Sequence, residues 1–474
     1  MLYNIAPERC VTCLACVRVC PSDAVEVVAD HVQIVDAACT RCGLCVPACP
    51  HDAIQVTGDF ERALEIVLDG RAVLILSVEA AAYFYPATPE QVVNACYAAG
   101  FRTVHRGVLG DELVAREYQR LWADDDWGTM IRSTCPVVVE TVRTQYPELI
   151  PYLAPITTPI AAEARYLKEM YGAPTPVVYA GVCLTEGGAE VEAAITFGEL
   201  RRLVERRGVD IDTQPLHFDR VPEERRRFDS TAGGLPLELL AGERHSSRRF
   251  RKLRGLGQLE AVARAVGVDR IDLGFVDILP CEGCLDHPLL GPKSELFWRR
   301  QIVGATEPPR ARFPVVDQEV AAAVQVGAAF PIERPAAGPP ADVVDDILDR
   351  IGLAPNGRPW DCGACGYATC RAFARAAAVG RTTLKSCPPH LEQEARQARL
   401  QAAEDALTRL ASFRVLRDRL AHEVARSKRT GDAFAVLFCD LDNFKQVNDR
   451  FGHEAGNEVL RSTAQEVAGL IRST

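Results

Sequence analysis

The chain has 474 residues, of which 48% are hydrophobic and 25% charged, with a formal net charge of -10. This length predicts roughly three domains. The acidic balance and the lack of a Lys-rich tail argue against nucleic acid as a partner. No apolar window of ~18 residues is present, and the first nine residues lack the charged start and apolar core of a secretory signal. We therefore expect a cytoplasmic protein without a membrane segment.

Eighteen cysteines are present, and in a reducing cytosol clustered cysteines usually bind metal. Two runs with the same spacing come first, "CVTCLACVRVCP" from Cys10 and "CTRCGLCVPACP" from Cys39. Zinc sites also use paired Cys-x-x-Cys, but they rarely show this fourfold run. In two-cluster ferredoxins the last Cys of each run ligates the other cluster. The predicted ligands are Cys10, Cys13, Cys16 and Cys49 for one [4Fe–4S] cluster, and Cys39, Cys42, Cys45 and Cys20 for the second.

Residues 1–58 thus resemble a bacterial two-cluster ferredoxin domain, and residues 24–37 between the runs predict a hairpin. Residues 59–304 alternate short apolar runs with helical patterns, which predicts an α/β domain with a parallel sheet. The clearest predicted strands are 72–78, 177–184 and 271–279, and the clearest predicted helices are 89–100 and 160–172.

Four cysteines of this α/β region each follow an apolar run and enter a loop. They are Cys135, Cys183, Cys281 and Cys284. Loops at the ends of parallel strands converge on one side of a sheet, so the four thiols can form one more [4Fe–4S] site. The alternative is that Cys135 and Cys183 are small core residues.

The segments "STCPVVVETV" from Ser133, "VVYAGVCL" from Val177 and "LPCEGCLDHP" from Leu279 resemble the three cysteine loops of iron-only hydrogenases. The resemblance implies that the same four cysteines hold a [4Fe–4S] cluster, which carries a diiron subsite in catalytic members. The counterpart of Cys284 bridges cubane and diiron in those members. The sequence leaves open whether this chain carries a diiron subsite.

Three features depart from the catalytic pattern. Thr134 stands where catalytic members have a proton-relaying cysteine, and its hydroxyl is a far weaker acid than a thiol. Glu186 follows the second loop, where catalytic members place a lysine, and the third loop has a shortened Cys-x-x-Cys. These departures resemble the branch of the family that is attached to signalling domains.

Residues 305–341 are rich in Pro and Ala and predict a linker, and residues 342–390 predict a small helical unit. This unit contains "WDCGACGYATC", which resembles a small Fe–S domain found after hydrogenase-like domains. Zinc is the alternative on ligand count alone. The predicted ligands of this fourth cluster are Cys362, Cys365, Cys370 and Cys387.

Residues 390–410 contain no Gly or Pro and predict one continuous helix, with Leu400, Ala403, Leu407 and Leu410 at a/d spacing. We interpret residues 391–412 as a signalling helix through which the chain forms a homodimer.

Residues 434–439, "FAVLFC", predict a strand that ends at Asp440, which on its own is more typical of a solvated turn than of a site. The following "DLDNFKQVNDRFGHEAGNEVL", together with "EDALTRLASFRVLRDRL" before it, resembles the first half of a GGDEF diguanylate cyclase domain over residues 413–474. The resemblance implies magnesium binding by Asp440, phosphate contacts by Lys445 and His453, and guanine contacts by Asn448 and Asn457. No GGDEF stretch appears before Thr474, so we expect no cyclic di-GMP synthesis from this chain. We expect Cys96 and Cys439 to be core residues.

The predicted fold class is multidomain α/β. It combines a ferredoxin-like two-cluster α+β domain, an α/β hydrogenase-like domain, a small helical Fe–S domain, a helical linker and a partial α/β GGDEF domain. We interpret the chain as a redox or hydrogen sensor in which four iron–sulfur sites follow the domain order, with a protein or small reductant as redox partner. Mg²⁺ and GTP belong only to a completed output domain. The alternatives are a working iron–sulfur oxidoreductase with a vestigial tail, and an electron-binding module without output.

The threonine at position 134 leads to a testable prediction about the rate of hydrogen oxidation. We expect the anaerobically matured protein to oxidise hydrogen at least about 100-fold more slowly than catalytic members, because a positioned proton relay contributes roughly that much. Thr134→Cys is expected to raise the rate of hydrogen-dependent dye reduction, and Thr134→Ser to leave it unchanged. Rapid turnover by the unmodified chain would overturn the sensor interpretation.

Overall fold

The computed structural model describes residues 2–28, 31–123, 128–219, 250–306, 316–331, 339–354 and 356–470. The chain folds as two units, which are described separately. The first comprises Met1–Ile347 and Asp361–Thr383, and the second comprises Leu348–Trp360 and Leu384–Thr474. The predicted multidomain α/β class is confirmed, and both larger sheets of the first unit are parallel.

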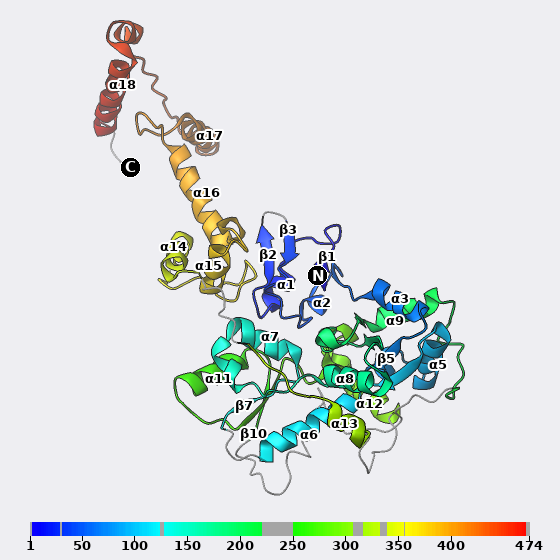
Figure 1. Cartoon of the computed structure of the whole chain (residues 1–474). Helices are drawn as coiled ribbons and strands as arrows, with labels where there is room; N and C mark the ends of the chain where they lie inside the picture. The colour runs from blue at the N-terminus through cyan, green and yellow to red at the C-terminus, as the bar shows by residue number, and fades with distance from the viewer. Residues whose placement is uncertain are drawn as a thin grey trace. The chain divides into compact units, whose positions relative to one another are not determined.

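The N-terminal domain consists of two small antiparallel sheets and two short helices (Figure 1). The hairpin expected within residues 24–37 forms from β2 and β3, and its Val25 and Val27 side chains are buried, as β-branched residues in a half-buried strand commonly are. The pairing of β1 with β4 joins the two ends of the domain. The elements are β1 (Tyr3–Ile5), α1 (Ala15–Val19), β2 (Val25–Val28), β3 (His31–Ile34), α2 (Cys45–Ala48) and β4 (Ile54–Val56).

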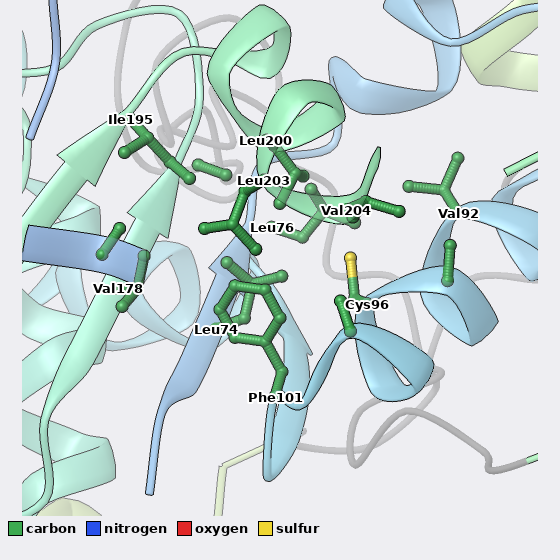
Figure 2. Close-up of a cluster of buried hydrophobic side chains, with 14 of the residues drawn as sticks. Leu74, Leu76, Val92, Cys96, Phe101, Val178, Ile195, Leu200, Leu203 and Val204 are labelled. Carbon is green, nitrogen blue, oxygen red and sulfur yellow. The ribbon is translucent and has the colours of Figure 1, made fainter. Parts of the chain in front are cut away.

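The larger parallel sheet has the strand order β6-β5-β8-β9. Its central strand β5 reads "VLIL" without polar alternation and is buried throughout, which is typical of a strand covered on both faces. Figure 2 shows Leu74 and Val178 from these strands packing with Leu203 and with Cys96, whose predicted core position is confirmed. The strands are β5 (Val73–Leu76), β6 (Thr103–Arg106), β8 (Val177–Ala180) and β9 (Ala193–Ile195).

The helices around this sheet begin at capping residues that the sequence supplies. Thr88 and Thr196 each form a capping box, with Gln91 and Glu199 respectively. The helices predicted over 89–100 and 160–172 are confirmed as α5 and α8. The helices are α3 (Phe60–Leu68), α4 (Ala80–Tyr83), α5 (Pro89–Ala99), α6 (Leu109–Ala123), α7 (Pro136–Gln145), α8 (Pro159–Tyr171) and α9 (Phe197–Arg206).

The second parallel sheet has the order β10-β11-β7 and is held by a buried ion triad. The Arg132 guanidinium lies 2.6 Å from the Asp277 carboxylate, and Arg254 lies 3.1 Å from its other oxygen. Arg132 also donates to the Thr134 hydroxyl, so the triad fixes the start of the first cysteine loop. The elements are β7 (Met130–Ile131), β10 (Phe250–Arg254), α11 (Gln258–Gly267), β11 (Phe275–Leu279) and α12 (Leu296–Thr306), with 3₁₀ turns η1 (Pro147–Tyr152), η2 (Gly188–Glu190), η4 (Cys284–Asp286), η5 (Pro288–Leu290) and η6 (Lys293–Glu295).

Part of the predicted linker 305–341 is packed rather than extended. Val316 is buried, and the Asp317 amide donates to the Tyr166 hydroxyl at 2.9 Å. Arg165 donates to the carbonyl of Gln325 at 2.6 Å. The linker prediction is therefore wrong for residues 316–328, because valines between the prolines and alanines, with the short helix α13 (Gln318–Ala323), cover part of the core beside α8. Residues 307–315 and 332–338 lie outside the described residues.

The continuous helix predicted over 390–410, and with it the signalling helix 391–412, ends earlier. Helix α16 (Pro388–Ala403) stops before Asp405, whose carboxylate accepts hydrogen bonds from the amides of Leu407 and Thr408. Asp and Thr side chains compete with helical backbone hydrogen bonds in this way, and they outweigh the absence of Gly and Pro. The other helices after residue 340 are α14 (Ala341–Ile351), α15 (Cys370–Ala378), α17 (Phe413–Thr430) and α18 (Phe444–Leu470), with the turn η7 (Leu384–Ser386) before α16.

The strand predicted at 434–439 is absent, and Cys439 is exposed instead of lying in a core. Phe438 is 98% exposed, and α17 buries none of its side chains. A strand needs a partner for its ladder, and no other strand is described in the second unit. None of the described helices combines the length and apolar character needed to cross a bilayer.

The buried triad gives a stability prediction. Asp277→Ala leaves Arg132 buried without its carboxylate, so we expect a loss of ~3–5 kcal/mol in the free energy of unfolding, measured by urea denaturation. The matched control is Asp69→Ala, which removes an exposed pair with Arg71 and is expected to cost under ~1 kcal/mol. Equal losses in the two variants would contradict the assigned role of the triad.

Candidate metal centres

The first predicted cluster site is a small cavity in the N-terminal domain. Its thiols come from the first run and from the end of the second run, as the crossed ligation requires. The Cys49 sulfur also accepts a hydrogen bond from the Ala53 amide at 3.3 Å, which fixes its side chain beside β4. The four cysteines that line the cavity are Cys10, Cys13, Cys16 and Cys49.

The second predicted set is brought together by the same crossing. Burial raises the pKa of Cys42 to about 11, and the charge of Cys20 adds to that effect. Burial also raises the pKa of Cys45, followed by the charges of Cys42, Cys20 and Cys39. Burial, with the charges of neighbouring thiols, thus raises the pKa values of Cys39, Cys42 and Cys45, and such a gathering suits a cationic centre, which deprotonates coordinating thiols. The residues present fit an iron–sulfur cluster here.

The third cavity lies at the carboxyl ends of β7, β8 and β11, where the four separated cysteines meet. Cys135 precedes α7, Cys183 follows β8, and Cys281 and Cys284 follow β11. The space among them is about 590 Å³, part of it open to solvent. The lining is otherwise largely apolar, with Leu44, Val137, Leu279 and three prolines. The structure therefore brings together all four thiols that the sequence predicts, and they fit one more cluster.

The two residues that depart from the catalytic pattern also line this third cavity. Thr134 is buried and accepts a hydrogen bond from Arg132 at 2.5 Å. Burial raises the pKa of Glu186 to about 8, with further contributions from the charges of Glu79 and Asp111. Glu186 is therefore mostly protonated at neutral pH, and the Tyr179 hydroxyl donates to it at 3.2 Å. The described lining of the cavity includes no lysine.

Sequence reasoning missed two residues of this cavity. Cys42 belongs to the second ferredoxin-type set, yet it lines the third cavity as well. His287 is 7% exposed and also lies in the lining. Its position three residues after Cys284 was the available signal, because a residue that close to a ligand must lie near the site.

The fourth predicted set is divided between the two units. Cys362, Cys365 and Cys370 belong to the first unit, where the charges of the other two thiols add to the burial that raises the pKa of Cys365. Cys370 is fixed by Asp361, whose carboxylate accepts from its amide at 2.6 Å. Cys387 belongs to the second unit, and it is the residue directly before α16. The four-thiol site therefore stays a prediction.

Within the first unit, the N-terminal domain contacts both other cysteine regions. The Val27 amide donates to the Arg381 carbonyl at 2.6 Å, and Arg381 donates to the Asp23 carbonyl at 2.8 Å. Gly366 has φ +91°, and a Cβ added there would lie 3.0 Å from Val17. This contact next to Cys365 therefore requires glycine. On the other side, Cys42 lines the third cavity.

The predicted nucleotide residues lie in or before α18. Asp440, Lys445 and His453 are exposed, and Asn448 and Asn457 are partly buried. The Asn448 side chain lies against Gly456, where no Cβ would fit. Among the described residues no group of three or more His, Cys, Asp or Glu side chains is arranged to hold a single metal ion.

Four family models match the chain. They are the 4Fe-4S dicluster domain over residues 2–50, the C-terminal domain of the iron only hydrogenase large subunit over 75–235, the putative Fe-S cluster family over 360–389, and the diguanylate cyclase GGDEF domain over 402–474.

The curated relatives named here are similar to a short stretch of the chain. Diguanylate cyclase DosC of Escherichia coli K12 is 38% identical over 77 residues, which are 16% of this chain and 17% of that protein. Diguanylate cyclase DgcP of Pseudomonas aeruginosa is 40% identical over 88 residues, which are 19% of this chain and 12% of that protein. The chain therefore spans less than a fifth of the length of these relatives.

Solved structures of [FeFe]-hydrogenases are similar to part of the chain. A variant of [FeFe]-hydrogenase HydA1 from Chlamydomonas reinhardtii aligns with a TM-score of 0.43 and 16% identity, over 57% of this chain and 98% of that chain. HydA(deltaEFG) aligns with a TM-score of 0.39 and 18% identity, over 53% of this chain and 90% of that chain.

The crossed ligation gives a prediction about cluster identity. With four cubanes we expect about sixteen irons per chain, and single Cys→Ala variants are expected to lose about four. Cys49→Ala is expected to abolish the same electron paramagnetic resonance signal as Cys13→Ala, and Cys20→Ala the same signal as Cys42→Ala. Cys96→Ala is the control that keeps all iron. A Cys49→Ala spectrum that matches Cys42→Ala would contradict the crossing, and stoichiometric zinc would contradict the small-domain site.

Proposed function

We propose that this chain, which combines a 4Fe-4S dicluster domain, a hydrogenase-like domain and an Fe–S segment with a GGDEF domain, is a redox or hydrogen sensor. Its cysteine centres detect the redox state, and the output is control of a diguanylate cyclase activity. Four [4Fe–4S] clusters are proposed, one for each set of four cysteines. When bound, such clusters supply reversible storage and transfer of single electrons.

The proposal rests on one observation, which is that the dicluster domain contacts both the third cavity and the segment around Cys365. Its second cysteine run reaches the third cavity through Cys42, and its first helix lies against Gly366 beside Cys365. The sequence interpretation ordered the sites as ferredoxin, hydrogenase-like and small domain. We propose instead that the dicluster domain lies between the other two sites in the electron path, because it contacts both of them. This placement supports redox communication between the hydrogenase-like cavity and the Fe–S segment.

The link to the output is proposed to begin at Cys387. This residue directly precedes α16, and the first turn of that helix is tied down when His390 Nδ1 bonds the Arg350 carbonyl at 2.9 Å. A change at the thiol therefore acts on the first residue of a helix that leads toward the GGDEF domain. We propose a homodimer through α16, because cyclic di-GMP joins two GTP molecules. A redox protein or small reductant is the proposed partner, and Mg²⁺ and GTP serve the output.

The second candidate function is an iron–sulfur oxidoreductase, which the hydrogenase-like domain favours. Two observations weigh against fast hydrogen turnover. The Thr134 hydroxyl already accepts from Arg132, and the described cavity lining has no lysine. Glu186 is a carboxylic acid with a raised pKa at that place, so it supplies no positive charge.

The test compares the reconstituted chain under hydrogen, under dithionite and in air-free oxidised buffer. We expect slow hydrogen-dependent dye reduction, together with a several-fold change in amide hydrogen exchange in α16 between the oxidised and reduced states. Exchange in α5, far along the chain from any predicted ligand, serves as the internal control. Rapid dye reduction would favour the oxidoreductase, and unchanged exchange in α16 would contradict signalling.

A further inference from the structure

His287 is placed in the third cavity by its own backbone. Its amide donates to the Cys284 carbonyl at 3.0 Å, so the residue follows the last cysteine in a tight turn. The side chain is 7% exposed and lines the cavity together with the four thiols. Nothing in the cysteine pattern requires an imidazole at this point.

The hydrogen bonds determine which ring nitrogen carries the proton. Nδ1 of His287 accepts from the Leu289 amide at 3.2 Å, so its lone pair is in use. A neutral imidazole has one donor and one acceptor, and the proton is therefore on Nε2.

The Nε2–H group is a buried donor that has no hydrogen-bond partner within the described part of the chain. Buried donors in folded proteins are nearly always paired, so an acceptor is expected inside the cavity. The cavity lining contributes five thiols, which are the four predicted ligands and Cys42, and the predicted occupant of the cavity is rich in anionic sulfur. An anionic sulfur in the cavity can therefore accept the hydrogen bond from the His287 Nε2–H group.

The ring also touches the dicluster domain. Gly43 lies between Cys42 and Cys45 with φ +74°, and a Cβ added there would lie 3.3 Å from His287 Cε1. The imidazole is therefore enclosed between the second ferredoxin-type run and the third cysteine loop. Its orientation is fixed from both sides, by Gly43 at one ring carbon and by Leu289 at Nδ1.

We propose that His287 is a positioning residue whose Nε2–H donates a hydrogen bond to a sulfur of the cluster held by Cys135, Cys183, Cys281 and Cys284, and that this bond raises the reduction potential of that cluster. The inference rests on the proposed function, since it needs a cluster in this cavity. Reduction adds negative charge, and a donor to sulfur stabilises the more negative state.

The test is a redox titration of the full chain, reconstituted anaerobically and followed by electron paramagnetic resonance. The signal of this cluster is identified as the one that Cys183→Ala abolishes. His287→Phe keeps a ring but removes the donor, and His287→Gln keeps an N–H. We expect the Phe variant to shift the potential downward, with a change on the order of tenfold in the reduced-to-oxidised ratio at fixed potential, or ~59 mV for one electron. The Gln variant is expected to stay close to the unmodified chain.

The matched control is His105→Phe. His105 is also buried, at 1% exposed, but it bonds Tyr171 in another part of the fold and is not among the residues that line the cavity. Its substitution is expected to leave the potential unchanged. A shift as large as that of His287→Phe would overturn the inference, because general loosening of the core would then explain both.

Iron content separates the two proposals. If Cys183→Ala loses no iron, the cavity holds no cluster and both proposals are overturned. If it loses about four irons and His287→Phe keeps the potential, only the role of His287 is overturned. If the Phe variant fails to load the cluster, retention of iron by the Gln variant supports the N–H donor, and loss of iron by both variants overturns it.

Discussion

The structure of the first unit depends on one constraint: buried thiols from distant parts of the chain must meet around shared cavities. Each thiolate that approaches another in a place with little solvent raises the pKa of its neighbour, as Cys42 and Cys45 show. Such a gathering is unfavourable for the protein alone and is stabilised by a cationic centre. The two parallel sheets serve this constraint, because the loops that follow β7, β8 and β11 all contribute cysteines to the third cavity.

Much of the first unit could be predicted from the sequence. The apolar run of β5 and the capping threonines of α5 and α9 specify their elements locally, and no distant contact overrides them. The predicted ligand sets of the N-terminal domain came from the cysteine spacing. The predicted ligand set of the middle domain came from its resemblance to the cysteine loops of iron-only hydrogenases. The sequence places His287 close to the third cysteine loop, but its contact with the dicluster domain and the second role of Cys42 could not be predicted, because both depend on how that loop meets the dicluster domain. That meeting is a tertiary contact between residues about 240 positions apart.

The errors after residue 304 have different physical causes. "FAVLFC" has the composition of a buried strand, but it pairs with no described strand and leaves Phe438 almost fully exposed. The helix expected to reach residue 410 ends at Ala403, because the Asp405 carboxylate accepts hydrogen bonds from the amides of Leu407 and Thr408 in a turn. The linker prediction for residues 305–341 failed because a segment expected to be exposed is packed, with the Val316 side chain buried in the core.

The lining of the third cavity also has a consequence for assembly. Cys42 and Leu44 come from the start of the chain, whereas residues 279–288 are made more than 200 residues later. N-terminal domains generally fold first during synthesis, so the dicluster domain is complete while its neighbour still lacks two of four thiols. The wall of the third cavity that contains Leu44 is thus made well before Cys281 and Cys284, the last two predicted ligands of the site.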